Sequence, residues 1–98
     1  MEPVVLERSW LRHAVVIALV DLGGRASVAE LVRRLDEMGI GTHRNASRAV
    51  SDSLRWEIHK GRVRRSQRGQ YAVCVPPLTK RHVKYARQRV RDRLADRR

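Results

Sequence analysis

Residues 42–69 decide the fold, and they read THRNASRAVSDSLRWEIHKGRVRRSQRG. We interpret residues 43–60 as a helix that Gly61 ends, followed by a short basic hairpin. On a helical wheel of about 100° per residue, Arg44, Arg48 and Arg55 fall within roughly 40° of one another. The other side of this helix carries the apolar residues Ala46, Ala49, Val50 and Leu54. One face therefore fits a core, while the other presents guanidinium groups.

A first helix is expected over residues 9–22, with Ser9 as its N-cap. Gly23 and Gly24 follow and favour a left-handed helix end. This helix is apolar around most of its circumference, which indicates burial on more than one side. Either the C-terminal segment or a second protomer is expected to cover the spare side.

A second helix has the clearest local signal. Ser27 and Glu30 form a capping box, and apolar residues follow at helical spacing as far as Met38. The short turn 39–42 then leads to the third helix, for which Thr42 is the expected N-cap. Two helices joined by a short glycine-containing turn indicate a helix-turn-helix unit.

The segment after the third helix is expected to form a small sheet. Residues 62–65 and 70–75 are interpreted as two strands around the turn 66–69, and residues 25–26 as a third. Glu57 falls towards the inner face of the third helix, so we expect it to pair with an arginine of another element. Trp56 is expected to cover the edge of the core, and Cys74 to be a small buried side chain.

The C-terminal segment begins with Pro76 and Pro77, which mark a stiff junction. Residues 79–98 contain nine Lys and Arg residues against two Asp. Apolar residues still recur at helical spacing, which predicts a narrow amphipathic helix rather than a disordered tail: Val83, Ala86, Val90 and Leu94. The expected organisation is a domain over 1–75, followed by the junction and basic helix over 76–98.

The charge is large and unevenly distributed. The chain of 98 residues has a formal net charge of +12. Residues 1–42 hold five arginines and six acidic residues, whereas residues 43–98 hold 17 basic and four acidic residues. Such a basic half favours a polyanionic partner. The alternative is a solvated surface in which coding bias supplies arginine, since 19 of the 22 basic residues are Arg.

Motifs for catalysis or metal binding are not found in the sequence. The histidines His13, His43, His59 and His82 have no ligand-pair spacing, and a single cysteine forms neither a disulfide nor a metal cluster. There is no glycine-rich phosphate loop and no nucleophile motif. The apolar run 14–20 is too short to span a bilayer. We expect a cytoplasmic protein that is not an enzyme, needs no cofactor or metal and does not bind a membrane.

The order of three helices and a hairpin over residues 9–75 resembles the winged helix-turn-helix superfamily. LRWE (54–57), GRV (61–63) and GQYAV (69–73) are similar to the third helix and wing of small bacterial winged-helix proteins. The resemblance implies an α+β fold that is mainly helical with a small β-hairpin, here followed by a basic C-terminal helix. It also implies that the third helix enters the DNA major groove and that the wing contacts the backbone or minor groove.

Double-stranded DNA is therefore the expected partner, for a transcription regulator or a nucleoid-associated protein. The resemblance places contacts on Arg44, Asn45, Arg48, Ser51, Arg55, Arg64, Arg65 and Arg68. We add the neighbouring basic residues Lys60, Arg62, Lys80, Arg81 and Lys84, the last three to grip flanking phosphates. Arginine can bind guanine and Asn45 adenine, although the arginines fit phosphate contacts equally well.

Two other functions stay open at this stage. The protein could associate with RNA or the ribosome, although it has few exposed aromatic residues for stacking on bases. It could also be a protein-interaction module that uses its apolar helix faces. A homodimer, formed through residues 9–22 or through the C-terminal helix, is a further expectation.

Overall fold

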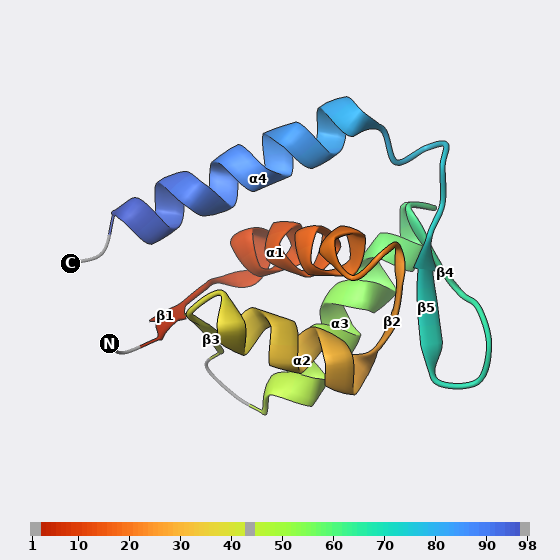
Figure 1. The fold of residues 1–98 in the computed structure, drawn as a ribbon, viewed down its shortest axis with the longest axis horizontal. Coiled ribbons are helices and arrows are strands. Elements are labelled where there is room, and N and C mark those ends of the chain that lie inside the picture. The colour runs from red at the N-terminus through yellow and green to blue at the C-terminus, as the bar shows by residue number, and fades with distance from the viewer. Residues whose placement is uncertain (1–2, 43–44, 97–98) are drawn as a thin grey trace.

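Four helices and a small antiparallel sheet make up most of the chain (Figure 1). The computed structural model describes residues 3–42 and 45–96. The elements are β1 (Val4–Val5), α1 (Arg8–Asp21), β2 (Arg25–Ser27), α2 (Val28–Glu37), β3 (Ile40–Gly41), α3 (Ala46–His59), β4 (Val63–Arg65), β5 (Gln70–Val73) and α4 (Lys80–Ala95). The predicted α+β class, mainly helical with a small hairpin, is confirmed.

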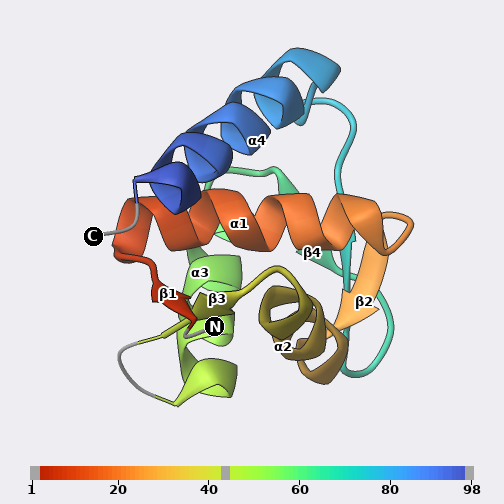
Figure 2. The same cartoon turned by 60° about the vertical axis from the view of Figure 1, so that its left-hand side comes forward.

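α1 is the central helix of the fold. Its apolar residues lie on nearly every side, so neighbouring elements must cover it all round. Ala14, Val15, Ile17, Ala18 and Leu19 are at most 1 % exposed. α4 packs on one side of α1, while α2 and α3 pack on the other (Figure 2). The C-terminal segment therefore covers the spare side of α1 within the chain, and the apolar surface on which a dimer through this helix was predicted is already buried.

The two ends of α1 differ in how far the sequence predicted them. The N-cap is Glu7 rather than Ser9, because the chain is already helical from Arg8 and Leu11 N donates to Glu7 O at 2.8 Å. The predicted C-terminal end is confirmed. Gly23 and Gly24 have φ angles of +91° and +89°, which only glycine adopts readily.

α2 begins with the predicted capping box. Glu30 N donates to Ser27 Oγ at 3.1 Å, and Ser27 N donates to Glu30 Oε1 at 2.9 Å. The hydrogen bond from the backbone of Ser27 lowers the pKa of Glu30. Leu31 and Leu35 face the core, so α2 is anchored by both its first turn and its apolar side.

The connection from α2 to α3 contains the main corrections. β3 pairs in parallel with β1, with Val4 opposite Ile40, a contact that the sequence analysis did not predict. α3 begins at Ala46, and its N-cap is Asn45 rather than Thr42. Asn45 Oδ1 accepts a hydrogen bond from Arg48 N at 3.1 Å, which satisfies a free donor of the first turn. The connection is thus longer than predicted.

The small sheet has the strand order β2-β5-β4, and all its pairings are antiparallel. The predicted hairpin and third strand are therefore confirmed, although β5 ends at Val73 rather than at Val75. Gly69, with a φ of +72°, closes the hairpin turn. Cys74 follows β5 and is partly exposed, not buried as predicted, although its backbone N still donates to Arg62 O at 2.8 Å.

α4 is the predicted amphipathic helix. Thr79 caps it by accepting from His82 N at 3.1 Å, and Leu78 just before the cap is buried. Ala86 and Val90 belong to the same core as α1, and Leu94 packs against its edge. α4 is therefore a structural layer of the fold and not a loosely attached tail.

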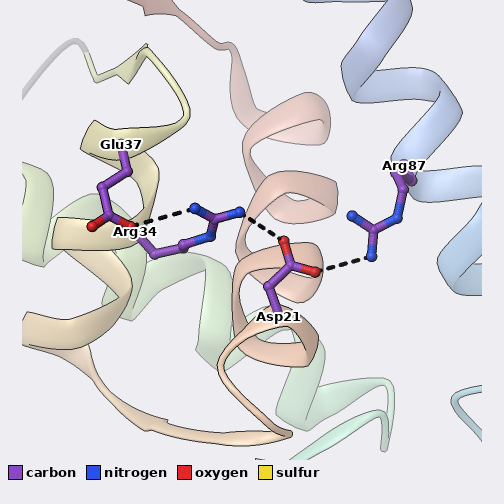
Figure 3. Close-up of polar contacts among 4 residues, drawn as sticks. All are labelled: Asp21, Arg34, Glu37 and Arg87. Carbon is purple, nitrogen blue, oxygen red and sulfur yellow. Dashed lines mark hydrogen bonds and ion pairs between the residues drawn. The ribbon is translucent and has the colours of Figure 1, made fainter.

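Asp21, at the end of α1, links α2 to α4 (Figure 3). Its Oδ2 accepts from Arg34 Nη2 at 3.1 Å, and its Oδ1 accepts from Arg87 Nη2 at 3.0 Å. Arg34 also contacts Glu37 at 3.3 Å. Burial alone would raise the pKa of Asp21, but the hydrogen bonds from Arg87 and Arg34 outweigh it, and this pKa lies below its ordinary value. One carboxylate thus connects three helices.

Candidate nucleic-acid interface

The exposed face of α3 carries two of the three predicted arginines. Arg48 and Arg55 are seven residues apart on the helix, and both are exposed. Ser51 lies between them along the helix and is half-buried. Arg44 lies outside the described residues. Two guanidinium groups therefore project from one side of a helix whose other side is anchored.

The anchored side of α3 is formed by apolar residues and one carboxylate. Ala49, Val50 and Leu54 are buried in the core, as predicted. Ser53 is also buried, and its hydroxyl donates to Ala49 O at 3.0 Å. Glu57 lies on the same side and is 2 % exposed. Because this side is fully engaged, the rotation of α3 about its axis is fixed.

Arg55 is only loosely held by its neighbour. Its Nη1 lies 3.9 Å from Asp52 Oδ1, and its side chain is 80 % exposed. An exposed pair at this distance contributes little to stability. The Arg55 guanidinium is therefore available to an external anion.

Asn45 has a structural role that the sequence analysis did not assign to it. The side-chain oxygen that caps α3 is the atom that bidentate pairing with adenine would also use. Pairing of Asn45 with a base would have to use the second lone pair of the same oxygen, in the orientation that the cap fixes. The position of Asn45 at the helix start explains both why it is exposed and why its oxygen is occupied.

The hairpin of β4 and β5 carries the second group of predicted contacts. Arg64 and Arg65 lie on β4, Arg68 lies in the turn, and all three are exposed. The Arg65 guanidinium lies 5.8 Å from the ring centre of Tyr71 on the paired strand. The hairpin follows the C-terminal end of α3 and runs along one edge of the molecule beside β2 (Figure 1). It presents three positive charges on a small, exposed ribbon.

Arg62 is not a surface contact, contrary to the sequence prediction. Its Nε donates to Glu57 Oε1 at 2.7 Å and its Nη2 donates to Glu57 Oε2 at 3.1 Å. The side chain of Arg62 is 23 % exposed. The hydrogen bond to Glu57 raises the pKa of Arg62. The predicted partner of Glu57 is thus found, and it is an arginine that had been assigned to nucleic acid.

Trp56 lies at the flank of α3, between two cations. The Arg12 guanidinium of α1 is 4.0 Å from its ring centre, and the Lys60 ammonium is 4.9 Å away. Trp56 is 37 % exposed, which agrees with the predicted place at the edge of the core. Arg12 was not among the predicted contacts, because the sequence gives no reason to place α1 beside this face.

An open groove of about 600 Å³ lies between the start of α1 and α3. Its walls include Leu6, Leu11 and Ala49, which also belong to the core. Arg12 and Arg55 line the same groove. A hollow beside the exposed face of α3 is thus bordered by guanidinium groups from two helices.

The predicted contacts on α4 lie apart from those on α3. Lys80, Arg81 and Lys84 are exposed on the first two turns of α4. α1 lies between α4 and α3 (Figure 2). These three cations are therefore not part of the face formed by Arg48 and Arg55.

No family model, curated protein or solved structure matches the chain. The function is therefore inferred from the residues themselves. Within residues 3–42 and 45–96, no helix combines the length and apolar character needed to cross a membrane. The same residues contain no group of three or more His, Cys, Asp or Glu side chains that could hold a metal ion.

Two histidines that are far apart in the sequence meet between α1 and α4. The ring centres of His13 and His82 are 6.2 Å apart, and Tyr85 lies edge-on to His13 at 5.8 Å. Burial, and after it the positive charge of Arg89, lowers the pKa of His13. Burial, and after it the charge of Arg62, lowers the pKa of His82. Both rings therefore favour the neutral form at the seam between the two helices.

Proposed function

We propose that the chain binds double-stranded DNA as a winged helix-turn-helix protein. In this proposal α3 enters the major groove and the β4–β5 hairpin acts as the wing. The observation that carries it is the pair Arg48 and Arg55, which are exposed on a helix whose other side is buried. A major groove admits an α-helix, and arginine can bind both guanine and phosphate there.

The order of the elements supports this proposal. Three helices, a strand between the first two and a hairpin after the third give the sheet β2-β5-β4 beside α3. The bidentate pair of Glu57 with Arg62 connects the end of α3 to the start of β4. A rigid connection of this kind would hold the wing at a fixed angle to the recognition helix, as simultaneous contact with two grooves requires.

The role in the cell that fits this proposal is transcription regulation or organisation of the nucleoid. The exposed cations available for contacts on α3 and the wing are Arg48, Arg55, Lys60, Arg64, Arg65 and Arg68. A mixture of base and phosphate contacts would give a regulator, whereas phosphate contacts alone would give a packaging protein.

Salt dependence of binding to a duplex tests the proposal. With about six phosphate contacts, affinity is expected to fall on the order of a thousandfold between 50 and 200 mM salt. The measurement is a fluorescence-anisotropy titration of a labelled duplex, with structured RNA as competitor. Affinity that does not change with salt, or a preference for RNA over the duplex, would contradict the proposal.

A further inference from the structure

The basic residues of α4 form two sets, one with partners within the chain and one that is exposed. Three half-buried arginines of α4 have partners within the chain. Arg87 donates to Asp21, Arg89 donates to the Tyr85 hydroxyl at 3.3 Å, and Arg93 lies 5.7 Å from the ring centre of Trp10. The contacts of Arg87 and Arg93 join α4 to α1, and Arg89 also lies 5.4 Å from the ring centre of Trp10 on α1.

The outer face of α4 carries a second set of cations. Lys80, Arg81, Lys84 and Arg91 are all exposed, and they fall within about 100° on a helical wheel. Within residues 3–42 and 45–96, none of the four has a carboxylate partner. We call these four cations the α4 stripe. At 1.5 Å per residue the stripe is about 16 Å long, which is roughly five base-pair steps of 3.4 Å.

This stripe and the face of α3 belong to different sides of the molecule. α1 separates α4 from α2 and α3, and α4 packs on the side of α1 that they leave free (Figure 2). When α3 lies in the major groove of a duplex, α1 would therefore stand between that helix and α4.

We propose that the outer face of α4 binds a second DNA duplex, so that one chain bridges two duplexes. This inference rests on the proposed function of α3. The contacts would be to phosphates, because lysines and arginines spaced along one helix match the regular charge of a backbone and need no particular base sequence.

A second copy of the chain is a poor occupant for this face. The stripe consists of like charges, which repel when two copies meet face to face. The apolar side of α4, with Ala86 and Val90, is already buried against the core. A polyanion, by contrast, would release counterions along the whole stripe.

A capture assay tests the bridge. One duplex is fixed to beads, the protein is added, and the amount of a fluorescent second duplex that is retained is measured at about 0.1 M salt. Affinity for a single duplex is measured in parallel by anisotropy, and the oligomeric state by sedimentation. The variants are Lys84→Gln/Arg91→Gln on α4 and Arg48→Gln/Arg55→Gln on α3, which lower the net charge equally. Lys84→Arg/Arg91→Lys keeps the charge and serves as the control.

The variants of α3 and α4 are expected to affect different measurements. The α4 variant should bind a single duplex within about threefold of wild type but lose about tenfold or more in capture, while the charge-preserving control captures normally. Capture by the α4 variant at the wild-type level, absence of capture by the wild type, or capture that depends on dimers alone would overturn the bridge. If the α3 variant instead binds a single duplex as tightly as wild type, the proposed function itself fails.

Discussion

Arg62 grips the buried carboxylate of Glu57 with two hydrogen bonds, of 2.7 and 3.1 Å. The two residues stand on either side of Gly61, where the chain turns from α3 into β4 with a φ of +79°. The pair therefore fixes the angle between the helix and the hairpin. Among the described residues, Arg62 is the only cation within ion-pair distance of the Glu57 carboxylate.

Removing Arg62 is expected to destabilise the fold. Arg62→Met leaves the Glu57 carboxylate buried without a partner, and the free energy of unfolding should fall by about 3 kcal/mol. The double variant Glu57→Met/Arg62→Met removes both charges and should recover much of this loss. Urea denaturation of both variants measures the effect. Equal destabilisation by the single and double variants would contradict a charge-based role.

Removing the exposed arginines of α3 should weaken DNA binding without affecting the fold. For Arg48→Ala/Arg55→Ala, the slope of log affinity against log salt should become shallower by about 1.8. The melting temperature should hardly change, because exposed substitutions typically alter stability by no more than about 0.5 kcal/mol. Arg25→Ala/Arg33→Ala, which removes two exposed arginines from β2 and α2, is the matched control. Unfolding of the α3 variant would mean that its arginines are structural.

Substitutions at Asn45 can distinguish its role as the N-cap of α3 from a role in base recognition. Asn45→Ala should cost about 1 kcal/mol of stability through loss of the N-cap, whereas Asn45→Asp keeps a capping oxygen and should be nearly neutral. If Asn45 also pairs with adenine, both variants lose sequence preference, since aspartate lacks the amide donor. Thermal denaturation together with binding to a panel of duplexes measures the two roles. A stable Asn45→Ala variant would argue against the cap.

The seam between α1 and α4 should weaken at mildly acidic pH. The pKa values of His13 and His82 are lowered from 6.5, by burial first and then by Arg89 and Arg62 respectively, despite the opposing charge of Glu57. Between pH 6.5 and the lower pKa values of the folded protein, the unfolded chain therefore binds more protons than the folded one. The two histidines thus contribute their full stability above pH 6.5, and this contribution decreases as the pH falls below 6.5. The melting temperature of His13→Gln/His82→Gln should depend less on pH between 7.5 and 5.5. If the melting temperature of this variant depended on pH as strongly as that of the wild type, the histidines would not be the cause of the acid destabilisation.

Asp21 should matter more than an ordinary surface carboxylate. Asp21→Asn weakens contacts to both Arg34 and Arg87, and we expect a loss of about 1 kcal/mol. Glu37→Gln, which affects Arg34 alone, is the control and should be close to neutral. Hydrogen exchange should accelerate at amides of α4 in the Asp21 variant and not in the control. The pKa of Asp21 in the folded protein lies below the ordinary value of 3.8. The stability that Asp21 contributes is therefore present above pH 3.8, and it is lost as the pH falls through the pKa of the folded protein.

Local signals in the sequence were enough to predict most of the elements. The capping box at Ser27 and Glu30 fixed the start of α2, and Gly61 ended α3. The inward position of Glu57 followed from helical spacing alone. These predictions succeeded because each depends on residues that are close in the sequence.

Features that depend on distant residues could not be predicted in the same way. The pairing of Val4 with Ile40 joins two very short strands, and the contact of His13 with His82 joins two helices. Thr42 and Asn45 are both good N-caps, and only the path of the chain through β3 decides between them. Arg62 looked like one more exposed cation, because the sequence does not show that Gly61 turns it back towards Glu57.

The sorting of basic residues into partnered and exposed sets has a consequence for the lifetime of the protein. The exposed cations of α3, β4 and α4 repel one another in the free chain, and this repulsion opposes compaction. A polyanion that binds only the folded form raises its stability in proportion to the logarithm of its concentration. Chains without such a ligand would open more often and be degraded sooner, so the abundance of the protein would follow the supply of its binding sites.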